Sequence, residues 1–264
     1  MRTDFERVSL TAEGAVAILA LNHPDSLNAI GPRMAHGFSG ALAEVENPAH
    51  GFRALLLTGE GRGFCSGANL SEPPESGGPL TAGAILDELY HPLLRRLRDL
   101  KLPIVTAVNG VAAGVGMSFA LMGDITVAAR SAYFVQAFAR IGLVPDGGST
   151  WLLPRLIGLA RARELSLLAE KLPAEKALEW GLINRVYEDN ELRDEALKMA
   201  SRLADGPTAA LALTRRLYWD SPGSGFEQQL GRERAAQDRA TATEDFREGI
   251  RAFRDKRPPQ FKGR

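Results

Sequence analysis

The stretch that decides the fold is Asn109-Gly-Val-Ala-Ala-Gly-Val-Gly-Met-Ser118. An apolar segment, Ile104–Val108, precedes it and predicts a buried strand that ends in a glycine-rich turn. A buried helix is predicted to follow over Gly114–Met122. The first N–H groups of a helix have no partner within it and point out of its positive end. The turn is therefore a candidate site for a negative oxygen, although close packing of helix on strand explains its glycines equally well.

Two other glycine-rich segments also follow apolar runs. Gly63–Leu70 comes after a strand predicted over Arg53–Thr58, and Gly142–Arg155 presents one carboxylate, Asp146, directly after a proline. That carboxylate is a catalytic base, or the N-cap of the helix expected from Thr150, or an ordinary turn residue. The catalytic interpretation requires Asp146 to face the first glycine-rich turn.

The rest of the chain alternates strands and helices and then becomes helical. Strands are predicted over Ala15–Leu21 and Ile125–Ala129, and helices over Met34–Glu46 and Ile85–Leu100. The proline- and glycine-rich residues 71–83 are expected to form a loop. The helices predicted after residue 150 are Arg161–Glu170, Ala174–Trp180, Glu191–Ala204, Pro207–Tyr218, Phe226–Ala240 and Glu244–Phe253. This order of elements predicts an α/β fold with a helical C-terminal region.

The bulk composition argues against several classes of partner. The 264 residues carry 32 Lys plus Arg and 32 Asp plus Glu, so a net charge of zero offers no long-range attraction to nucleic acid or an anionic membrane. No apolar run approaches the length of about 20 residues that a membrane span needs. The single cysteine, Cys65, excludes an intrachain disulfide and fits a reducing cytoplasm. The polar N-terminus lacks the apolar core of a signal peptide.

Other known motifs fit this chain poorly. Gly114-Val-Gly116 begins like a dinucleotide-binding fingerprint but lacks its third glycine and its ribose-binding acid. Gly116-Met-Ser118 resembles a nucleophile elbow, yet every histidine precedes the serine, whereas that fold needs one after it. The four histidines are scattered, so we expect no metal site. Cys65 has no histidine near it in sequence and is better explained as a small buried residue than as a nucleophile.

Ordered blocks along essentially the whole chain resemble the crotonase (enoyl-CoA hydratase/isomerase) superfamily. The blocks are Leu21-Asn-x-Pro24-x-x-Leu27-Asn28-Ala29, Phe64–Leu70, Asn109-Gly110-x-x-x-Gly114-x-Gly116, Gly142-x-x-Pro145, Leu153-Pro154-Arg155, Ala174–Asn184 and Pro259–Arg264. The resemblance implies a crotonase fold with a core of repeated ββα units over residues 1–200, which carries the CoA site and the active site. It also implies a helical trimerisation region over residues 201–264. A homotrimer or a dimer of trimers is expected, with an acyl-CoA substrate and no separate cofactor.

The resemblance further implies a catalytic apparatus. The main-chain N–H groups of Ala68 and Val115 match the family's oxyanion hole, which holds the thioester oxygen. Ser118 and Phe138 occupy the positions of two glutamates in hydratases, so the usual acid and base for hydration are absent. Asp146 matches a position used by a subset that includes 1,2-epoxyphenylacetyl-CoA isomerases. The apolar Phe138 is expected to raise the pKa of a nearby aspartate.

The remaining matches concern the binding of coenzyme A and substrate. They are Ser26, Leu27, Asn28, Ser66, Gly67, Asn69, Leu70, Gly114, Ser118 and Phe138. Phe261 and Lys262 match a C-terminal segment that reaches the nucleotide of a neighbouring subunit, or else they belong to a solvated tail.

With the resemblance, these residues predict a proton-shuttling isomerase of the enoyl-CoA or epoxyphenylacetyl-CoA type, and the resemblance connects such an enzyme with fatty-acid metabolism or phenylacetate degradation. Two alternatives remain. One is an enoyl-CoA hydratase that uses Asp146 together with a loop acid such as Glu72 or Glu75. The other is a protein that binds CoA esters without catalysis.

Overall fold

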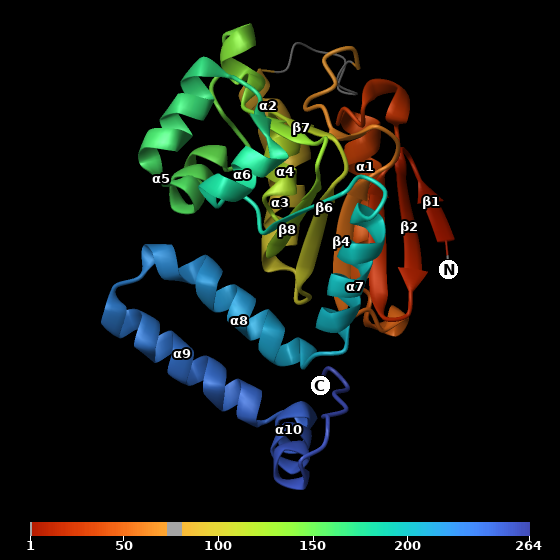
Figure 1. Ribbon diagram of the computed structural model, residues 1–264, viewed down its shortest axis with the longest axis vertical. Coiled ribbons are helices and arrows are strands. Elements are labelled where there is room, and N and C mark those ends of the chain that lie inside the picture. The colour runs from red at the N-terminus through yellow and green to blue at the C-terminus, as the bar shows by residue number, and fades with distance from the viewer. Residues whose placement is uncertain (1, 73–80) are drawn as a thin grey trace.

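A seven-stranded sheet forms the centre of the protein (Figure 1), as seen in a computed structural model that describes residues 2–72 and 81–264. Its strand order is β1-β2-β3-β4-β6-β8-β11. The strands are β1 (Arg2–Phe5), β2 (Val8–Glu13), β3 (Val16–Leu21), β4 (Ala54–Gly59), β6 (Ile104–Val108), β8 (Ile125–Ala129) and β11 (Arg185–Tyr187). The first three pair antiparallel and the others pair parallel. All four strands predicted for this sheet are confirmed; β1, β2 and β11 were not expected from the sequence.

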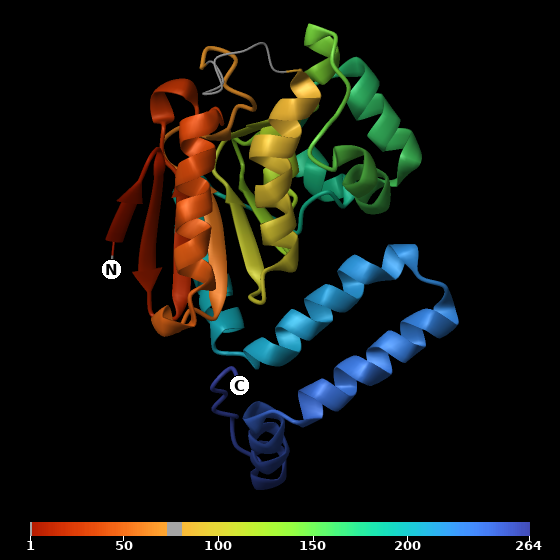
Figure 2. The same cartoon turned by 180° about the vertical axis from the view of Figure 1, so that it is seen from behind.

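Helices cover both faces of this sheet. α1 (Pro32–Glu46) and α3 (His91–Asp99) lie on one face, and α7 (Leu192–Ala204) lies on the other (Figures 1 and 2). In α1 the buried side chains include Met34, Phe38 and Leu42, whose spacing of four residues places them on one stripe of the helix. This double cover explains why β3, β4 and β6 are almost continuously apolar.

A second, four-stranded sheet has the order β10-β9-β7-β5. Its strands are β5 (Gly63–Cys65), β7 (Val111–Ala113), β9 (Tyr133–Val135) and β10 (Leu172–Pro173). Three times along the chain, a strand of the large sheet is followed by a short strand of this second sheet and then by a helical segment. The ββα repeat that the resemblance implied is therefore confirmed.

Three α-helices follow strands of the second sheet along the chain. α4 (Val115–Ala120) follows β7 directly, and its six residues are all buried. α5 (Ser149–Leu168) follows β9 after the 3-10 helix η4 (Ala137–Ile141), and α6 (Ala174–Trp180) follows β10. The six helices predicted after residue 150 are all confirmed and correspond to α5, α6, α7 and the three helices that follow α7.

The helix predicted over Ile85–Leu100 is interrupted by a wider turn. α2 (Ala82–Ile85) continues into a π-helical turn, η3 (Leu86–Tyr90), and then into α3. Such turns insert one extra residue per helical turn and often occur at functional sites. Here the turn ends at Tyr90, which is buried. Most of the loop predicted over residues 71–83 lies outside the described residues.

Three C-terminal helices project away from the two sheets (Figures 1 and 2): α8 (Thr208–Asp220), α9 (Phe226–Thr241) and α10 (Glu244–Asp255). The buried guanidinium of Arg215 attaches α8 to the core. It donates to the carbonyl oxygens of Leu97 and Leu100, at the C-terminal end of α3, and to the Asp124 carboxylate. These carbonyls have no partner within α3, so one arginine satisfies a helix end that would otherwise be buried without partners.

No helix in the described part of the chain is both long and apolar enough to cross a membrane.

Candidate active site

The carboxyl ends of β5, β7 and β9 lie at one edge of the second sheet, because these three strands are parallel. Ligands of α/β proteins commonly bind beyond the carboxyl ends of parallel strands. The first two glycine-rich segments singled out in the sequence contain the residues that follow β5 and β7, and the third begins after η4, which follows β9. The fold therefore brings these segments together.

The segments after β5 and β7 run side by side. A Cβ atom on Gly67 would lie 3.0 Å from the carbonyl oxygen of Ala113, and one on Gly116 would overlap the main chain of Cys65. Gly67 and Gly114 have φ angles of 105° and 51°, which strongly favour glycine. Glycine is therefore required here both for the sharp turns and for the close approach of the two chains.

Two main-chain donors are available at this edge. Ile30 N–H donates to the Gly67 carbonyl oxygen and Asn69 N–H donates to the Ile30 carbonyl oxygen, whereas the Ala68 N–H donates to none of the described residues. The N–H of Val115, the first residue of α4, also donates to none of the described residues. Both residues are those that match the oxyanion hole.

Asp146 lies beside the first turn of α4. A Cβ atom on the next residue, Gly147, would lie 2.7 Å from Ser118 Cβ and 3.3 Å from Val115 Cγ2. The Asp146 side chain does not cap the helix that follows, because the N-cap of α5 is Gly148 and no side chain caps it. The interpretation of Asp146 as the N-cap is therefore wrong, whereas Asp146 does lie in a turn, because its carbonyl oxygen accepts from the Ser149 N–H.

The carboxylate of Asp146 is partly buried and has an altered proton affinity. Its Oδ1 atom is shielded from solvent and has no hydrogen-bond partner among the described residues. Burial raises the pKa of Asp146 to about 6, and the nearby His91 opposes part of this rise. Desolvation disfavours the charged form of a carboxyl group, so the carboxylate holds a proton more tightly than an ordinary aspartate. At neutral pH the group is still mainly ionised and is a stronger base.

Ser118 is fully buried, and both of its side-chain contacts are internal. Its Oγ donates to the Asp146 carbonyl oxygen over 3.1 Å and lies 2.7 Å from Ser149 Oγ. The expectation that Ser118 contacts the substrate does not fit this position. Phe138 is also buried, and its ring lies over Gly114, where a Cβ atom would be 3.6 Å from Cζ.

The two N-terminal segments expected to bind CoA lie together. Ser66 N–H donates to the Leu27 carbonyl oxygen over 2.9 Å, and Ser66 Oγ donates to the Ser26 carbonyl oxygen over 2.8 Å. Leu27 packs against the small cluster of Val111, Ala113 and Val135 on the second sheet.

Asn28 has a structural role instead of the expected contact with CoA. Its side chain is fully buried, accepts a hydrogen bond from the His23 N–H, and donates to the carbonyl oxygens of Glu60 and Gly63. Both donor hydrogens of the amide are thereby used. The side chain of Asn28 therefore holds the loop that carries Ser26 and Leu27.

Beyond Ala68 the chain turns toward a group of charges. Leu70 is 77% exposed, and Asn69 donates to Glu72 over 3.2 Å. Glu72 in turn forms an ion pair with Arg7. Of the two loop acids considered for hydration, Glu72 is thus already paired, and Glu75 lies outside the described residues.

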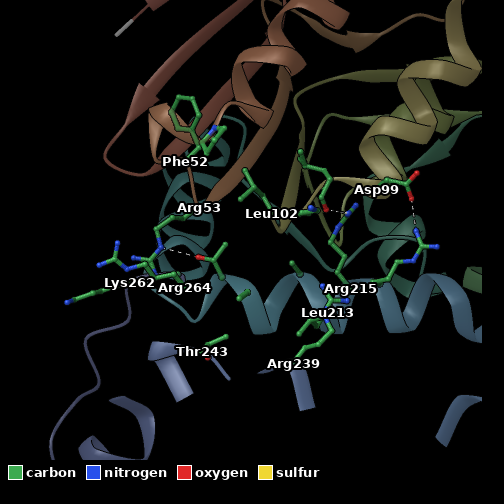
Figure 3. Close-up of a pocket in the computed structure, with 18 of the residues that line it drawn as sticks. Phe52, Arg53, Asp99, Leu102, Leu213, Arg215, Arg239, Thr243, Lys262 and Arg264 are labelled. Atoms are coloured by element: carbon green, nitrogen blue, oxygen red, sulfur yellow. Dashed lines mark hydrogen bonds and ion pairs between the residues drawn. The ribbon is translucent and has the colours of Figure 1, made fainter. Parts of the chain in front are cut away.

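The C-terminal residues expected to reach a nucleotide lie far from Asp146 in the same chain. Lys262 and Arg264 lie beside Arg53 at a cavity of about 930 Å³ between the core and α8 (Figure 3). The main chain holds this segment, since Lys262 N–H donates to Asp245 and the Phe261 carbonyl oxygen accepts from Arg53. The C-terminus and the edge with α2, β7 and α4 are at different ends of the molecule (Figure 1).

The sequence did not indicate two residues near Asp146. Burial is the largest cause that raises the pKa of the Tyr90 hydroxyl. The negative charge of the nearby Asp146 adds to this rise. Tyr90 donates to the Ile30 carbonyl oxygen over 3.0 Å, next to the Ala68 segment. Ser149 was not singled out, and no sequence signal distinguishes it from an ordinary first-turn serine. Cys65, as expected, is a buried residue, and burial raises the pKa of its thiol to about 12.

Similar proteins exist along the full length of this chain. Residues 11–264 match the model of the enoyl-CoA hydratase/isomerase family. The chain is 45% identical over 255 residues to the 1,2-epoxyphenylacetyl-CoA isomerase of Escherichia coli, which covers 96% of this chain and 97% of that protein. It is 32% identical over 263 residues to the short-chain-enoyl-CoA hydratase of Clostridium acetobutylicum, and the match covers 99% of this chain and 100% of that protein. A solved structure of an enoyl-CoA hydratase from Polaromonas sp. JS666 is similar with a TM-score of 0.88 and 35% identity, over 96% of this chain and 99% of that chain.

Proposed function

The chain belongs to the enoyl-CoA hydratase/isomerase (crotonase) family, and on that premise we propose that it is an acyl-CoA isomerase with Asp146 as its only base. The observation that carries the proposal is the partly buried carboxylate of Asp146, a residue whose carbonyl oxygen accepts a hydrogen bond from Ser118 in the helix that begins with Val115. The substrate is a CoA thioester whose acyl group is unsaturated, cyclic or aromatic.

The unused N–H groups of Ala68 and Val115 hold the thioester oxygen. When a proton leaves the acyl chain, negative charge develops on that oxygen, and each aligned donor stabilises the transition state by about 3–4 kcal/mol. The donors are main-chain groups, so the valine side chain at position 115 does not impair them. The resulting enolate is the intermediate of the reaction.

Asp146 moves the proton. With a 2-enoyl thioester, the carboxylate removes a proton from the γ carbon, and the electrons shift through the double bond onto the thioester oxygen. The same carboxyl group then returns the proton to the α carbon, which gives the 3-enoyl thioester. No proton is gained or lost overall. A pKa of about 6 suits both steps, because the group is ionised at neutral pH and still binds a proton readily.

Hydration is less well supported by these residues. It needs one group to orient and deprotonate water and another to protonate the α carbon. Ser118 and Phe138 cannot do this as carboxylates would, and Glu72 is paired with Arg7. The relative in Escherichia coli is named as an isomerase and that in Clostridium acetobutylicum as a hydratase, so the names alone leave both reactions open.

The distinguishing experiment compares two reactions in one preparation. Isomerisation is followed with 2-enoyl and 3-enoyl thioesters by chromatography, and hydration is followed with crotonyl-CoA by loss of the conjugated thioester absorbance. We expect isomerisation that Asp146→Asn abolishes and Glu72→Gln retains. Crotonyl-CoA hydration as fast as isomerisation, and sensitive to Glu72→Gln, would support the hydratase instead. Tight CoA-ester binding with neither reaction would support a binding protein.

We also infer that α8, α9 and α10 form the contacts of a homotrimer or a dimer of trimers. Large apolar side chains on these helices are exposed to solvent in the single chain, including Tyr218 at 75%, Phe226 at 74% and Phe253 at 84%. Exposed apolar surface of this kind is typical of subunit contacts. In such an assembly Phe261 and Lys262 reach the CoA nucleotide of a neighbouring subunit, which accounts for their distance from Asp146 in one chain.

A further inference from the structure

No described residue donates a hydrogen bond to either carboxylate oxygen of Asp146. For a base this is an advantage, because hydrogen bonds to the carboxylate would stabilise the charged form and weaken its affinity for a proton. It also means that the carboxylate is not held in place by its own oxygens. Hydrogen bonds from the described residues can therefore fix the position of this side chain only through the main chain of Asp146.

The main chain of Asp146 is held at its carbonyl oxygen. Two groups donate to this atom: the N–H of Ser149 over 3.0 Å and the hydroxyl of Ser118 over 3.1 Å. The first contact belongs to the turn itself. The second comes from α4, the helix whose first residue, Val115, supplies an oxyanion donor. Ser118 therefore joins the segment that carries the base to the helix that carries the oxyanion site.

The proton positions in this buried chain follow from its chemistry. The Asp146 carbonyl oxygen can only accept, so Ser118 donates its hydroxyl proton there. At the 2.7 Å contact between the two serines, Ser118 must then accept and Ser149 must donate. Ser149 Oγ in turn accepts from Gln136 Nε2 over 3.3 Å. All three side chains are buried, so the chain Gln136–Ser149–Ser118 has one consistent direction that ends at Asp146.

We propose that Ser118 is the positioning residue for Asp146: its hydroxyl fixes the Asp146 carbonyl and so places the carboxylate relative to the two oxyanion donors, without weakening the base. The inference rests on the proposed function. It replaces the expectation that Ser118 contacts the substrate. Small displacements of a catalytic group are costly, since about 1 Å can lower a rate by roughly 10²-fold.

The test is the pair Ser118→Thr and Ser118→Val. Threonine and valine have the same shape, so both place the same extra methyl group beside Gly147, but only threonine keeps the hydroxyl. We expect kcat for isomerisation to be roughly ten-fold or more lower in Ser118→Val than in Ser118→Thr, with KM nearly equal. A purely structural role would change the thermal unfolding of the two variants without separating their kcat values. Equal kcat values, or a difference confined to KM, would overturn the proposal.

A second comparison avoids the added methyl group. Ser118→Ala lowers kcat, and the double variant Ser118→Ala/Ser149→Ala lowers it no further, because the Ser149 hydroxyl acts on Asp146 only through the hydroxyl of Ser118, which the first change has already removed. Independent, multiplicative losses would contradict this. Asp146→Asn is measured alongside: if that variant keeps full activity, the proposed function fails. If Asp146→Asn is inactive while Ser118→Thr and Ser118→Val are equal, only the inference about Ser118 fails.

Discussion

Gly147 packs so closely on Ser118 that a side chain at position 147 would have its Cβ atom 2.7 Å from Ser118 Cβ. Glycine at 147 therefore determines how near Asp146 lies to α4. We expect Gly147→Ala to displace Asp146 and to lower kcat by roughly ten-fold or more. The measurement is the steady-state rate of isomerisation with the protein shown to be folded by circular dichroism.

The neighbouring glycine is a matched control for that change. Gly148 also has a positive φ, 84° against 59° at Gly147, but a Cβ atom there would contact nothing within 4 Å. Gly148→Ala should cost about 1 kcal/mol of stability from backbone strain and leave kcat close to that of the unchanged protein. Equal losses of kcat at the two positions would show that backbone strain, not the contact with Ser118, is responsible.

The rate should depend on pH through Asp146. Because burial raises its pKa to about 6, the free enzyme loses its base as the pH falls below this value. We expect kcat/KM to rise with pH to a plateau above about 7, with a midpoint near 6. An acid limb near pH 4, as for an ordinary aspartate, would contradict the burial of this group.

The free energy of unfolding should also depend on the ionisation of Asp146. It should fall as the pH rises, whereas the rate should increase. The folded-state pKa of Asp146 lies above its ordinary value of 3.8, so the fold favours the protonated form, and stability from this group falls as the pH rises from about 4 to about 6. Asp146→Asn should therefore be more stable than the unchanged protein at pH 8, by on the order of 1 kcal/mol given the partial exposure of the group. The difference should disappear near pH 4. Thermal unfolding at both pH values measures it.

Arg215 should be critical for the attachment of α8. Its guanidinium lies 2.6 Å from Asp124 and satisfies carbonyl groups at the end of α3, and it is almost fully buried. We expect Arg215→Ala to destabilise the protein by on the order of 3 kcal/mol, because Asp124 loses its buried partner. Arg216 pairs with Asp99 and Asp220 on the surface, so Arg216→Ala should cost less than about 1 kcal/mol. Denaturant unfolding compares the two.

The oligomeric state can be tested at an exposed aromatic residue. Phe253 on α10 is 84% exposed in the single chain, and Phe253→Arg should shift the assembly toward smaller species in sedimentation velocity. Leu70→Arg, at an apolar position that is 77% exposed beside the site, is the control and should leave the assembly unchanged. If the protein without any substitution sediments as a monomer, the proposed trimer is contradicted.

The sequence was sufficient for the long buried strands and for the parts of the site that depend on glycine. β3, β4, β6 and β8 are apolar runs bounded by turn residues, and Gly67 and Gly114 mark turns that only glycine tolerates well. The strands of the second sheet were not predictable, because three residues such as Val111–Ala113 are too few to show a period. The ββα repeat therefore came only from the family resemblance.

Side-chain roles were harder to predict than their positions. Asn28 and Ser118 occur within the expected segments, but whether they face a ligand or the interior depends on partners distant in sequence, such as Gly63 and Asp146. Tyr90 was missed for another reason. A pattern with 3.6 residues per turn cannot anticipate the π-helical turn that places it near Asp146.

The most direct measurement is exchange of acyl protons with solvent. An acyl-CoA thioester is incubated in D₂O with the protein or with Asp146→Asn, and deuterium at the α and γ carbons is followed by NMR. We predict rapid exchange with the unchanged protein and a rate lower by roughly 10²-fold or more in Asp146→Asn, with thioester binding retained. Exchange at an undiminished rate in Asp146→Asn would contradict the assignment of Asp146 as the base.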